Sequence, residues 1–190
     1  MRTTRTKNVI AAVLAGGLLA VTSPAFAETQ SPKSSEPAPL ASSSVKAEAA
    51  AAEPLALRNL KSQKYIQPSG ASTSVGARLV QQPLSSGAWQ SWWLVADGSY
   101  TTFWNDNSGL NAGIDGGSTS AGAVGIQATP SGDLNQDWTL NWRSDTVFEL
   151  KNRKSGLCLG ISGASTANGA VAAQFACDGT ANQGWQLITR

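Results

Sequence analysis

The chain has 190 residues, with 14 Lys and Arg against 12 Asp and Glu. A protein that binds nucleic acid or an anionic membrane would carry a strong basic surplus, so this balance argues against both partners. His is absent, which removes the side chain most often used as a general base.

The first 27 residues have the parts of a secretory signal peptide. Arg2, Arg5 and Lys7 precede the apolar run VIAAVLAGGLLAV, and Ala25-Phe26-Ala27 has the small-x-small form of a cleavage site. A membrane anchor is the alternative, but about 20 apolar residues are needed to cross a bilayer and this run is shorter. We therefore predict cleavage of residues 1–27 and a secreted, extracellular protein.

Residues 28–56 are dominated by Ser, Pro, Ala and Glu and contain no aromatic residue. Such a composition cannot bury enough apolar surface to offset the entropy of ordering the chain, so it predicts a disordered linker. The remaining segment, 57–190, contains all seven Trp residues and has the length of one domain.

Two cysteines occur in the chain, Cys158 and Cys177. An exported protein meets an oxidising compartment, where a disulfide bond is the expected state. Two free buried thiols are the alternative. We predict a stabilising bridge that is not a redox switch.

The predicted domain contains a threefold internal repeat, which is marked by a Gln-x-Trp motif followed by a Leu. The motif residues are Gln90 and Trp92, Gln136 and Trp138, and Gln183 and Trp185. Further identities in fixed register are Asn59, Asn105 and Asn152; Ser62, Ser108 and Ser155; Gly76, Gly122 and Gly169; and Gln81, Gln127 and Gln174. So many identities at one spacing indicate three copies of one structural unit.

Each copy lacks helical periodicity, and its short apolar pairs are separated by Gly, Ser, Asn and Thr. That pattern is typical of short strands joined by turns. Three units are too few for a propeller, which has four to eight blades. The sequence therefore predicts an all-β fold, a β-trefoil of three repeats at about 57–99, 100–145 and 146–190.

The triple Gln-x-Trp pattern resembles the ricin-type (R-type) lectin domain, a β-trefoil carbohydrate-binding module, over Leu57 to the C-terminus. The resemblance places Cys158 and Cys177 where that family often has a disulfide within a repeat. Sugar platforms are one interpretation of the three motif Trp residues. We favour a structural role, because equivalent Trp residues from three repeats converge on one core and the adjacent Gln bonds buried backbone groups.

The resemblance implies a sugar pocket in each repeat, formed by an Asp, an aromatic platform and an Asn next to the motif Gln. A carboxylate accepts sugar hydroxyls strongly, an amide both donates and accepts, and an aromatic ring covers the apolar face of the sugar. In repeat order, the Asp position holds Gln67, Gly113 and Gly160, the platform position holds Gln82, Ala128 and Phe175, and the Asn position holds Trp89, Asn135 and Asn182. The third repeat comes nearest to the family pattern, so we predict carbohydrate binding at Phe175, Asn182 and Gln183. Packing in the domain is the alternative role for Phe175.

These observations predict a non-catalytic carbohydrate-binding module whose sites are individually weak. With His absent and the cysteines paired, we expect no enzymatic activity, no cofactor and no metal site. Asp133 and Asp137 are close in sequence, but we interpret both as turn residues. The alternative function is a degenerate trefoil that binds a protein partner, as an inhibitor or surface adaptor, because the family's Asp is missing from all three repeats.

Overall fold

The computed structural model describes residues 37–40 and 53–190. The predicted signal peptide, 1–27, and residues 28–36 and 41–52 of the predicted linker lie outside the described part. Within the described part, the regular elements are twelve strands and six short 3-10 helices, so the predicted all-β class is confirmed. No helix among these residues is long and apolar enough to cross a membrane.

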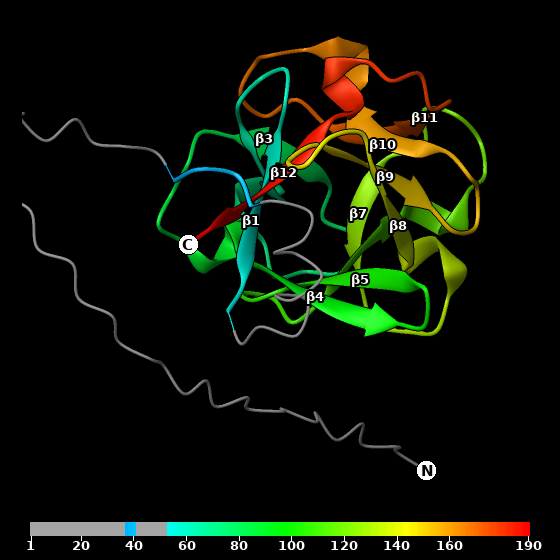
Figure 1. The fold of residues 1–190 in the computed structure, drawn as a ribbon. Coiled ribbons are helices and arrows are strands. Elements are labelled where there is room, and N and C mark those ends of the chain that lie inside the picture. Colours follow the sequence, from blue (N-terminus) through cyan, green and yellow to red (C-terminus); the bar gives the residue numbers. More distant parts are fainter. Residues whose placement is uncertain (1–36, 41–52) are drawn as a thin grey trace, which may run out of the picture. The chain divides into compact units, whose positions relative to one another are not determined.

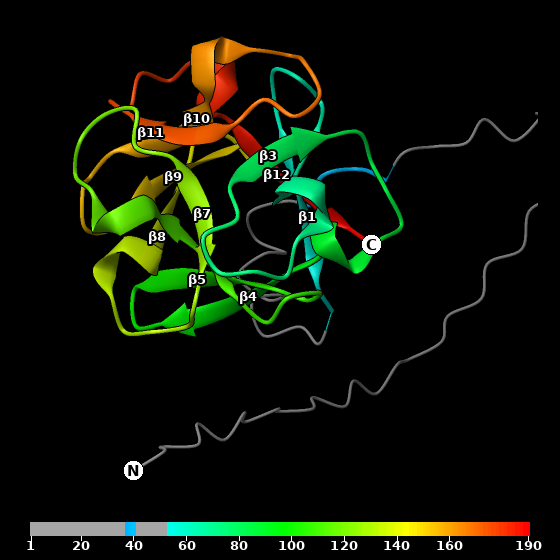
Figure 2. The ribbon, with the colours of Figure 1, turned by 180° about the vertical axis from the view of Figure 1, so that it is seen from behind.

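Six strands form a closed antiparallel barrel (Figures 1 and 2): β1 (Leu55–Asn59), β4 (Trp92–Asp97), β5 (Tyr100–Asn105), β8 (Trp138–Trp142), β9 (Phe148–Asn152) and β12 (Trp185–Thr189). Neighbours pair in the order β1, β4, β5, β8, β9, β12, and β12 pairs with β1 to close the ring. Closure leaves the barrel without an exposed sheet edge along its circumference.

Three hairpins complete the trefoil, one in each repeat: β2 (Tyr65–Pro68) with β3 (Leu79–Gln82), β6 (Asn111–Ile114) with β7 (Gly125–Ala128), and β10 (Cys158–Ile161) with β11 (Ala172–Phe175). Single bridges connect the hairpins to one another: Arg78 with Ile126, Val80 with Val171, and Val124 with Ala173. The strands divide the domain into repeats at 55–97, 100–142 and 148–189. The first strand thus begins at Leu55, two residues before the start that the composition suggested.

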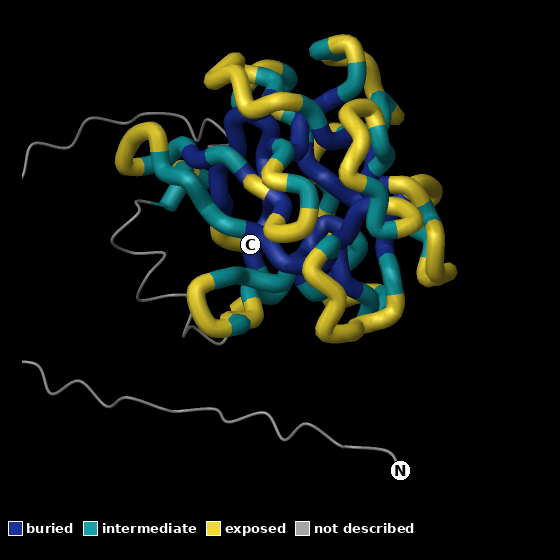
Figure 3. Tube along the Cα trace, turned by 90° about the vertical axis from the view of Figure 1, so that its right-hand side faces the viewer, coloured by how far each residue is buried: buried dark blue, intermediate teal, exposed yellow. Residues whose placement is uncertain are grey.

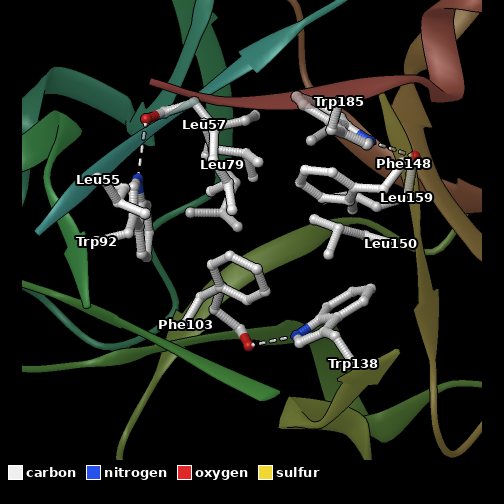
Figure 4. Close-up of a cluster of buried hydrophobic side chains, with 14 of the residues drawn as sticks. Leu55, Leu57, Leu79, Trp92, Phe103, Trp138, Phe148, Leu150, Leu159 and Trp185 are labelled. Atoms are coloured by element: carbon white, nitrogen blue, oxygen red, sulfur yellow. Dashed lines mark hydrogen bonds between the residues drawn. The ribbon is translucent and has the colours of Figure 1, made fainter. Parts of the chain in front are cut away.

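The three motif Trp residues lie in the core of the barrel and expose 1% of their surface or less. Each indole N–H donates to a backbone carbonyl in the hairpin of its own repeat, at 3.2 Å for Trp92, 3.1 Å for Trp138 and 2.9 Å for Trp185. Figure 4 shows these rings around a centre filled by Leu and Phe side chains. Burial of this kind leaves no ring face for a sugar.

Most of the other repeat identities hold neighbouring repeats together. One Gln in each repeat, which recurs in fixed register, donates its side-chain amide to two backbone carbonyls in a loop of another repeat. The donors and acceptors are Gln81 to Ser165 and Ala167, Gln127 to Ser72 and Ser74, and Gln174 to Ser118 and Ser120. The bonds are reciprocal, because the loop glycine donates its backbone N–H to the backbone carbonyl of the same Gln: Gly76 to Gln127, Gly122 to Gln174 and Gly169 to Gln81. We call these contacts the glutamine ring. The glycines have φ of 83°, 84° and 76°, a conformation that other residues adopt at a cost.

The interior is dark blue and the loops are yellow in Figure 3, as expected for short strands that bury one face. Every buried side-chain nitrogen and oxygen of the described residues has a hydrogen-bond partner. The segment 37–40 belongs to this domain, although its composition predicted a linker. Pro39 forms a bridge to Ile188, Leu40 donates its backbone N–H to Leu187 at 2.8 Å, and Leu40 packs against the core. The reason is that β12 pairs with β9 only at Trp185, which leaves the later backbone groups on that side of β12 open to another segment.

Candidate functional site

Equivalent positions in the three repeats bring together a hairpin and the 3-10 helix that precedes the last strand of the repeat. These helices are η2 (Ala88–Gln90), η4 (Leu134–Gln136) and η6 (Ala181–Gln183). Each ends on the motif Gln, and each lies beside β2, β6 or β10, the strand that carries the family's Asp position. The sequence positions that we compared are therefore neighbours in space, and the three repeats differ in what occupies them.

In the third repeat, Gly160 and Asn182 are in direct contact. A Cβ atom added to Gly160 would lie 3.4 Å from Asn182 Nδ2, 3.2 Å from its backbone oxygen and only 2.9 Å from Gln183 Cγ. Because η6 fills the space in which a side chain would start, the missing carboxylate leaves no empty socket. Phe175 is half-buried at the end of β11, opposite Cys158 on β10.

The two amides next to each other on η6 have different surroundings. Gln183 is 1% exposed, its Nε2 donates to Ala176 at 2.8 Å, and its Oε1 accepts from the backbone of Asp178 at 3.2 Å. Both polar ends are thus used inside the protein, and Gln183 holds the loop before η6 in place. Asn182 is half-buried, and its Oδ1 lies 2.6 Å from the hydroxyl oxygen of Thr180.

The loop before η6 is stabilised further by charge. The Asp178 carboxylate accepts from the hydroxyl and the backbone N–H of Thr180, at 2.7 and 2.9 Å. These hydrogen bonds, chiefly the one from the hydroxyl, lower the pKa of Asp178 below its ordinary value. Arg143 pairs with Glu149 at 3.3 Å and donates to the carbonyl of Thr180, so β9 and the segment before it also support this loop.

The second repeat has an open groove of about 620 Å³ at the equivalent place. Its lining residues include Ile126, Ala128, Thr129, Ser131, Asp133, Leu134, Asn135 and Lys154. Asn135 keeps the amide position and donates its Nδ2 to the carbonyl of Ile114 at 2.9 Å. With Ala128 in place of an aromatic platform, the groove is wide and has no ring to stack on a sugar.

Lys154 is the residue of this groove that sequence reasoning missed. It follows β9 and therefore comes from the third repeat, yet it lines the groove of the second. A comparison of positions within one repeat cannot find it. Asp115, two residues beyond the Asp position, is exposed at the start of η3 (Asp115–Gly117).

The first repeat has lost the pocket. Gln67 is buried and its Oε1 accepts from Gln90 Nε2 at 2.9 Å, so the group in the Asp position is spent on the motif Gln. Trp89 replaces the amide, and its ring lies over Gly87, where an added Cβ would fall 2.2 Å from the ring. Gln82, in the platform position, is half-buried at the end of β3.

The Trp residues outside the motif are half-buried and lie on different parts of the domain. Trp93 and Trp104 are opposite each other on β4 and β5, and Trp93 donates its indole N–H to Asp106 at 2.8 Å. Trp142 packs on Phe148 with 5.0 Å between ring centroids.

The predicted disulfide between Cys158 and Cys177 is confirmed, with 5.0 Å between the two Cα atoms. It joins β10 to the loop that follows β11, beside the Phe175 position. The Glu149 carboxylate lies within 4.8 Å of both sulfur atoms. Sulfur atoms that are joined to each other are not thiolate ligands, so this group does not make a metal site.

Asp133 and Asp137 have separate surroundings, although they are close in sequence. Asp133 is exposed and accepts from the Ser131 hydroxyl at 2.8 Å. Asp137 is 2% exposed and pairs with Arg153 at 3.0 Å. Arg153 also lies over the ring of Tyr100, 4.2 Å from its centroid. Asp137 thus has a structural role, because it joins the start of β8 to the turn after β9.

Comparison with known proteins agrees with this architecture. A family model described as ricin-type beta-trefoil lectin domain-like matches residues 48–128 and 134–190. A search of curated proteins found no match. The designed threefold-symmetric protein ThreeFoil is 36% identical with a TM-score of 0.71, and the match covers 72% of this chain and 99% of that one.

Two natural proteins are similar over the same part of the chain. An exo-beta-1,3-galactanase from Clostridium thermocellum is 28% identical with a TM-score of 0.71, and the match covers 73% of this chain but only 30% of the enzyme. The ricin B-like lectin of Macrolepiota procera, solved in complex with lactose, is 20% identical with a TM-score of 0.64, and the match covers 73% of this chain and 96% of the lectin. The chain belongs to the ricin-type β-trefoil lectin domain-like family.

Proposed function

We propose that this protein is a non-catalytic carbohydrate-binding module that acts outside the cell. The family supports carbohydrate as the class of ligand, since lectins with this fold are described with lactose and with GalNAc. The basic start, the apolar run and the Ala25-Phe26-Ala27 sequence support export. The absence of His from the sequence and the use of both cysteines in a bridge support a role in binding.

The observation that carries the proposal is the arrangement in the third repeat. Asn182 faces Gly160 on β10, and Phe175 lies on β11, the strand paired with β10. The exposed part of the Phe175 ring covers the C–H face of a sugar, and the Asn182 amide bonds its hydroxyls. Gln183 positions Asn182 and makes no sugar contact in this proposal, because its own amide is buried and bonded.

The expected affinity is low. A carboxylate in the pocket would accept hydroxyl hydrogen bonds worth about 1.5–3 kcal/mol, and Gly160 supplies none. A monosaccharide should therefore bind with a dissociation constant in the range of about 1 mM. Useful retention on a polysaccharide then requires many contacts along one chain or several sites on one surface.

Titration of the mature protein with a panel of neutral mono- and oligosaccharides tests the proposal. Phe175→Ala should abolish binding and leave the fold intact, because the core Trp residues are untouched. Val95→Ala is the matched control, since Val95 is an apolar side chain 47% exposed on β4. Equal sugar binding by wild type and Phe175→Ala would reject this site, and hydrolysis of a glycoside by the purified protein would reject the non-catalytic role.

Binding of a protein partner is the second candidate, favoured by one observation. In the second and third repeats the Asp position is a glycine, and η4 or η6 packs directly against it. In the first repeat it is a Gln whose side chain is hydrogen-bonded inside the protein. A wide sugar panel separates the two functions. No binding at about 10 mM sugar, together with saturable capture of one purified protein partner, would favour this second function over the first.

A further inference from the structure

The groove of the second repeat contains a lysine amine that has no polar partner in the part of the chain that the structure describes. No hydrogen bond or ion pair of the Lys154 amine occurs among residues 37–40 and 53–190. The amine leans over Gly117, where an added Cβ would lie 2.6 Å from Lys154 Nζ and 3.6 Å from Asn135 Oδ1. The strongest donor of the groove thus lies beside a free amide acceptor.

Gly117 is what permits this approach. It has a left-handed backbone, with φ of 59°, and the equivalent residues of the other repeats are Ala71 and Ala164, with φ of 55° and 50°. The fold therefore accepts a methyl group at this position in two repeats out of three. Only in the second repeat is the methyl group absent, and that is where the lysine amine occupies the space.

The groove also lacks the carboxylate that the family has at the Asp position. Gly113 stands at the Asp position, and η4 closes on it, with an added Cβ 3.1 Å from Gln136 Cγ. Asp133 is the acidic lining residue, and its carboxylate is engaged by the Ser131 hydroxyl. Leu134 is 43% exposed and supplies an apolar wall. The volume of about 620 Å³ is within the range of small-molecule sites.

We propose that this groove binds a carboxylate-bearing sugar residue, a uronic acid of an acidic glycan. Lys154 binds the sugar carboxylate, Asn135 Oδ1 accepts a ring hydroxyl, and Leu134 covers the C–H face. Charge is thereby reversed relative to the family pattern, in which the protein supplies the carboxylate and the sugar supplies hydroxyls. The inference rests on the proposed carbohydrate-binding function and gives it a class of ligand.

The experiment compares an acidic probe with its neutral methyl ester. The mature protein is titrated with an oligogalacturonide and with its methyl ester, and backbone NMR signals of Gly117 and Asn135 report the site. The acid should bind about threefold to fivefold more tightly than the ester, as an exposed ion pair allows. Raising the ionic strength from about 0.01 M to about 1 M should remove that preference, because the Debye length falls from about 30 Å to about 3 Å.

Four variants identify the residues. Lys154→Ala should remove the preference for the acid, and Lys151→Ala, a nearby exposed lysine on β9, should retain it. Gly117→Ala should also remove it by displacing the amine. Alanine is strained at this left-handed φ, so some stability is lost, but Ala71 and Ala164 show that the fold tolerates alanine there. Asp133→Asn should strengthen binding of the acid by lowering repulsion.

The outcomes separate this inference from the function on which it rests. Equal binding of acid and ester, or an unchanged preference in Lys154→Ala, overturns the uronic acid site while carbohydrate binding stands. Absence of binding by both probes and by every member of the neutral panel overturns both. An acid preference that Gly117→Ala and Lys154→Ala both abolish supports the site.

Discussion

Removal of the disulfide between Cys158 and Cys177 should lower the stability of the domain by an amount that the structure allows us to work out. The bridge closes a loop with a sequence separation of 19 residues, for which the chain-entropy model gives about 3 kcal/mol at 25 °C. In a domain of this size, each kcal/mol of lost stability lowers the melting temperature by roughly 3–4 °C. We therefore expect the melting temperature to fall by about 10 °C. The magnitude arises in the unfolded state, because the bridge restricts that state most.

The variant has to avoid a second defect. Cys158 is completely buried and Cys177 is exposed, so Cys158→Ala with Cys177→Ser leaves no hydroxyl buried without a partner. Thermal unfolding followed by near-ultraviolet circular dichroism, where the Trp residues dominate the signal, measures the shift. Wild type in excess reductant should unfold near the temperature of the variant, and reductant should leave the variant unchanged.

A fall of less than about 2 °C in the melting temperature would refute the reasoning. It would mean that restricting this loop in the unfolded state adds nothing to the stability of the domain. A variant that unfolds far below reduced wild type would refute it differently, by assigning the loss to packing at the substituted positions. Two titratable thiols in the native protein would show that the bridge does not form.

Three further predictions concern stability. Trp138→Phe should cost about 1–3 kcal/mol by urea titration, because the carbonyl of Ala112 loses its indole donor inside the core. Asp137→Ala should destabilise the domain by about 1–3 kcal/mol, because its carboxylate is buried and hydrogen-bonded to Arg153. Asp97→Ala should cost less than about 1 kcal/mol, because its carboxylate is half-exposed and lies 3.7 Å from Arg153. Equal losses would contradict this difference in burial. The pKa of Asp178 is lowered in the folded protein, so its carboxylate adds a small stabilisation above the ordinary aspartate pKa of about 3.9. This stabilisation is lost as the pH falls through the folded pKa, and NMR titration of the side chain will detect the lowered value.

The fold could be predicted from the sequence because the residues that recur in the three repeats lie within one short stretch of each repeat, at the same spacing. Gln136 and Trp138 recur with their counterparts at one spacing, and a threefold pattern of short strands fits the trefoil better than a propeller. The disulfide was predictable for a similar reason, since both cysteines belong to one repeat and the predicted signal peptide implies an oxidising compartment. Local pattern and global fold agree in these features.

Contacts between repeats were beyond the reach of the same reasoning. Lys154 lines a groove that belongs to the preceding repeat, and the single-repeat comparison that assigned Asn135 to that groove could not include it. Leu40 looked like part of a linker by composition, yet it packs against the core through β12. In both cases the partner is distant in sequence and depends on where the barrel closes.

The glutamine ring makes the three repeats depend on one another. Each amide reaches the loop of a different copy, and the donors run around the threefold axis without a break, so one copy alone leaves its amide and its loop carbonyls without partners. Three separate copies could satisfy the same bonds as a symmetric homotrimer of peptides of about 46 residues, with the chain connections contributing only proximity. The ring therefore makes each repeat depend on the other two for its hydrogen bonds, so the three repeats should unfold together as one cooperative unit.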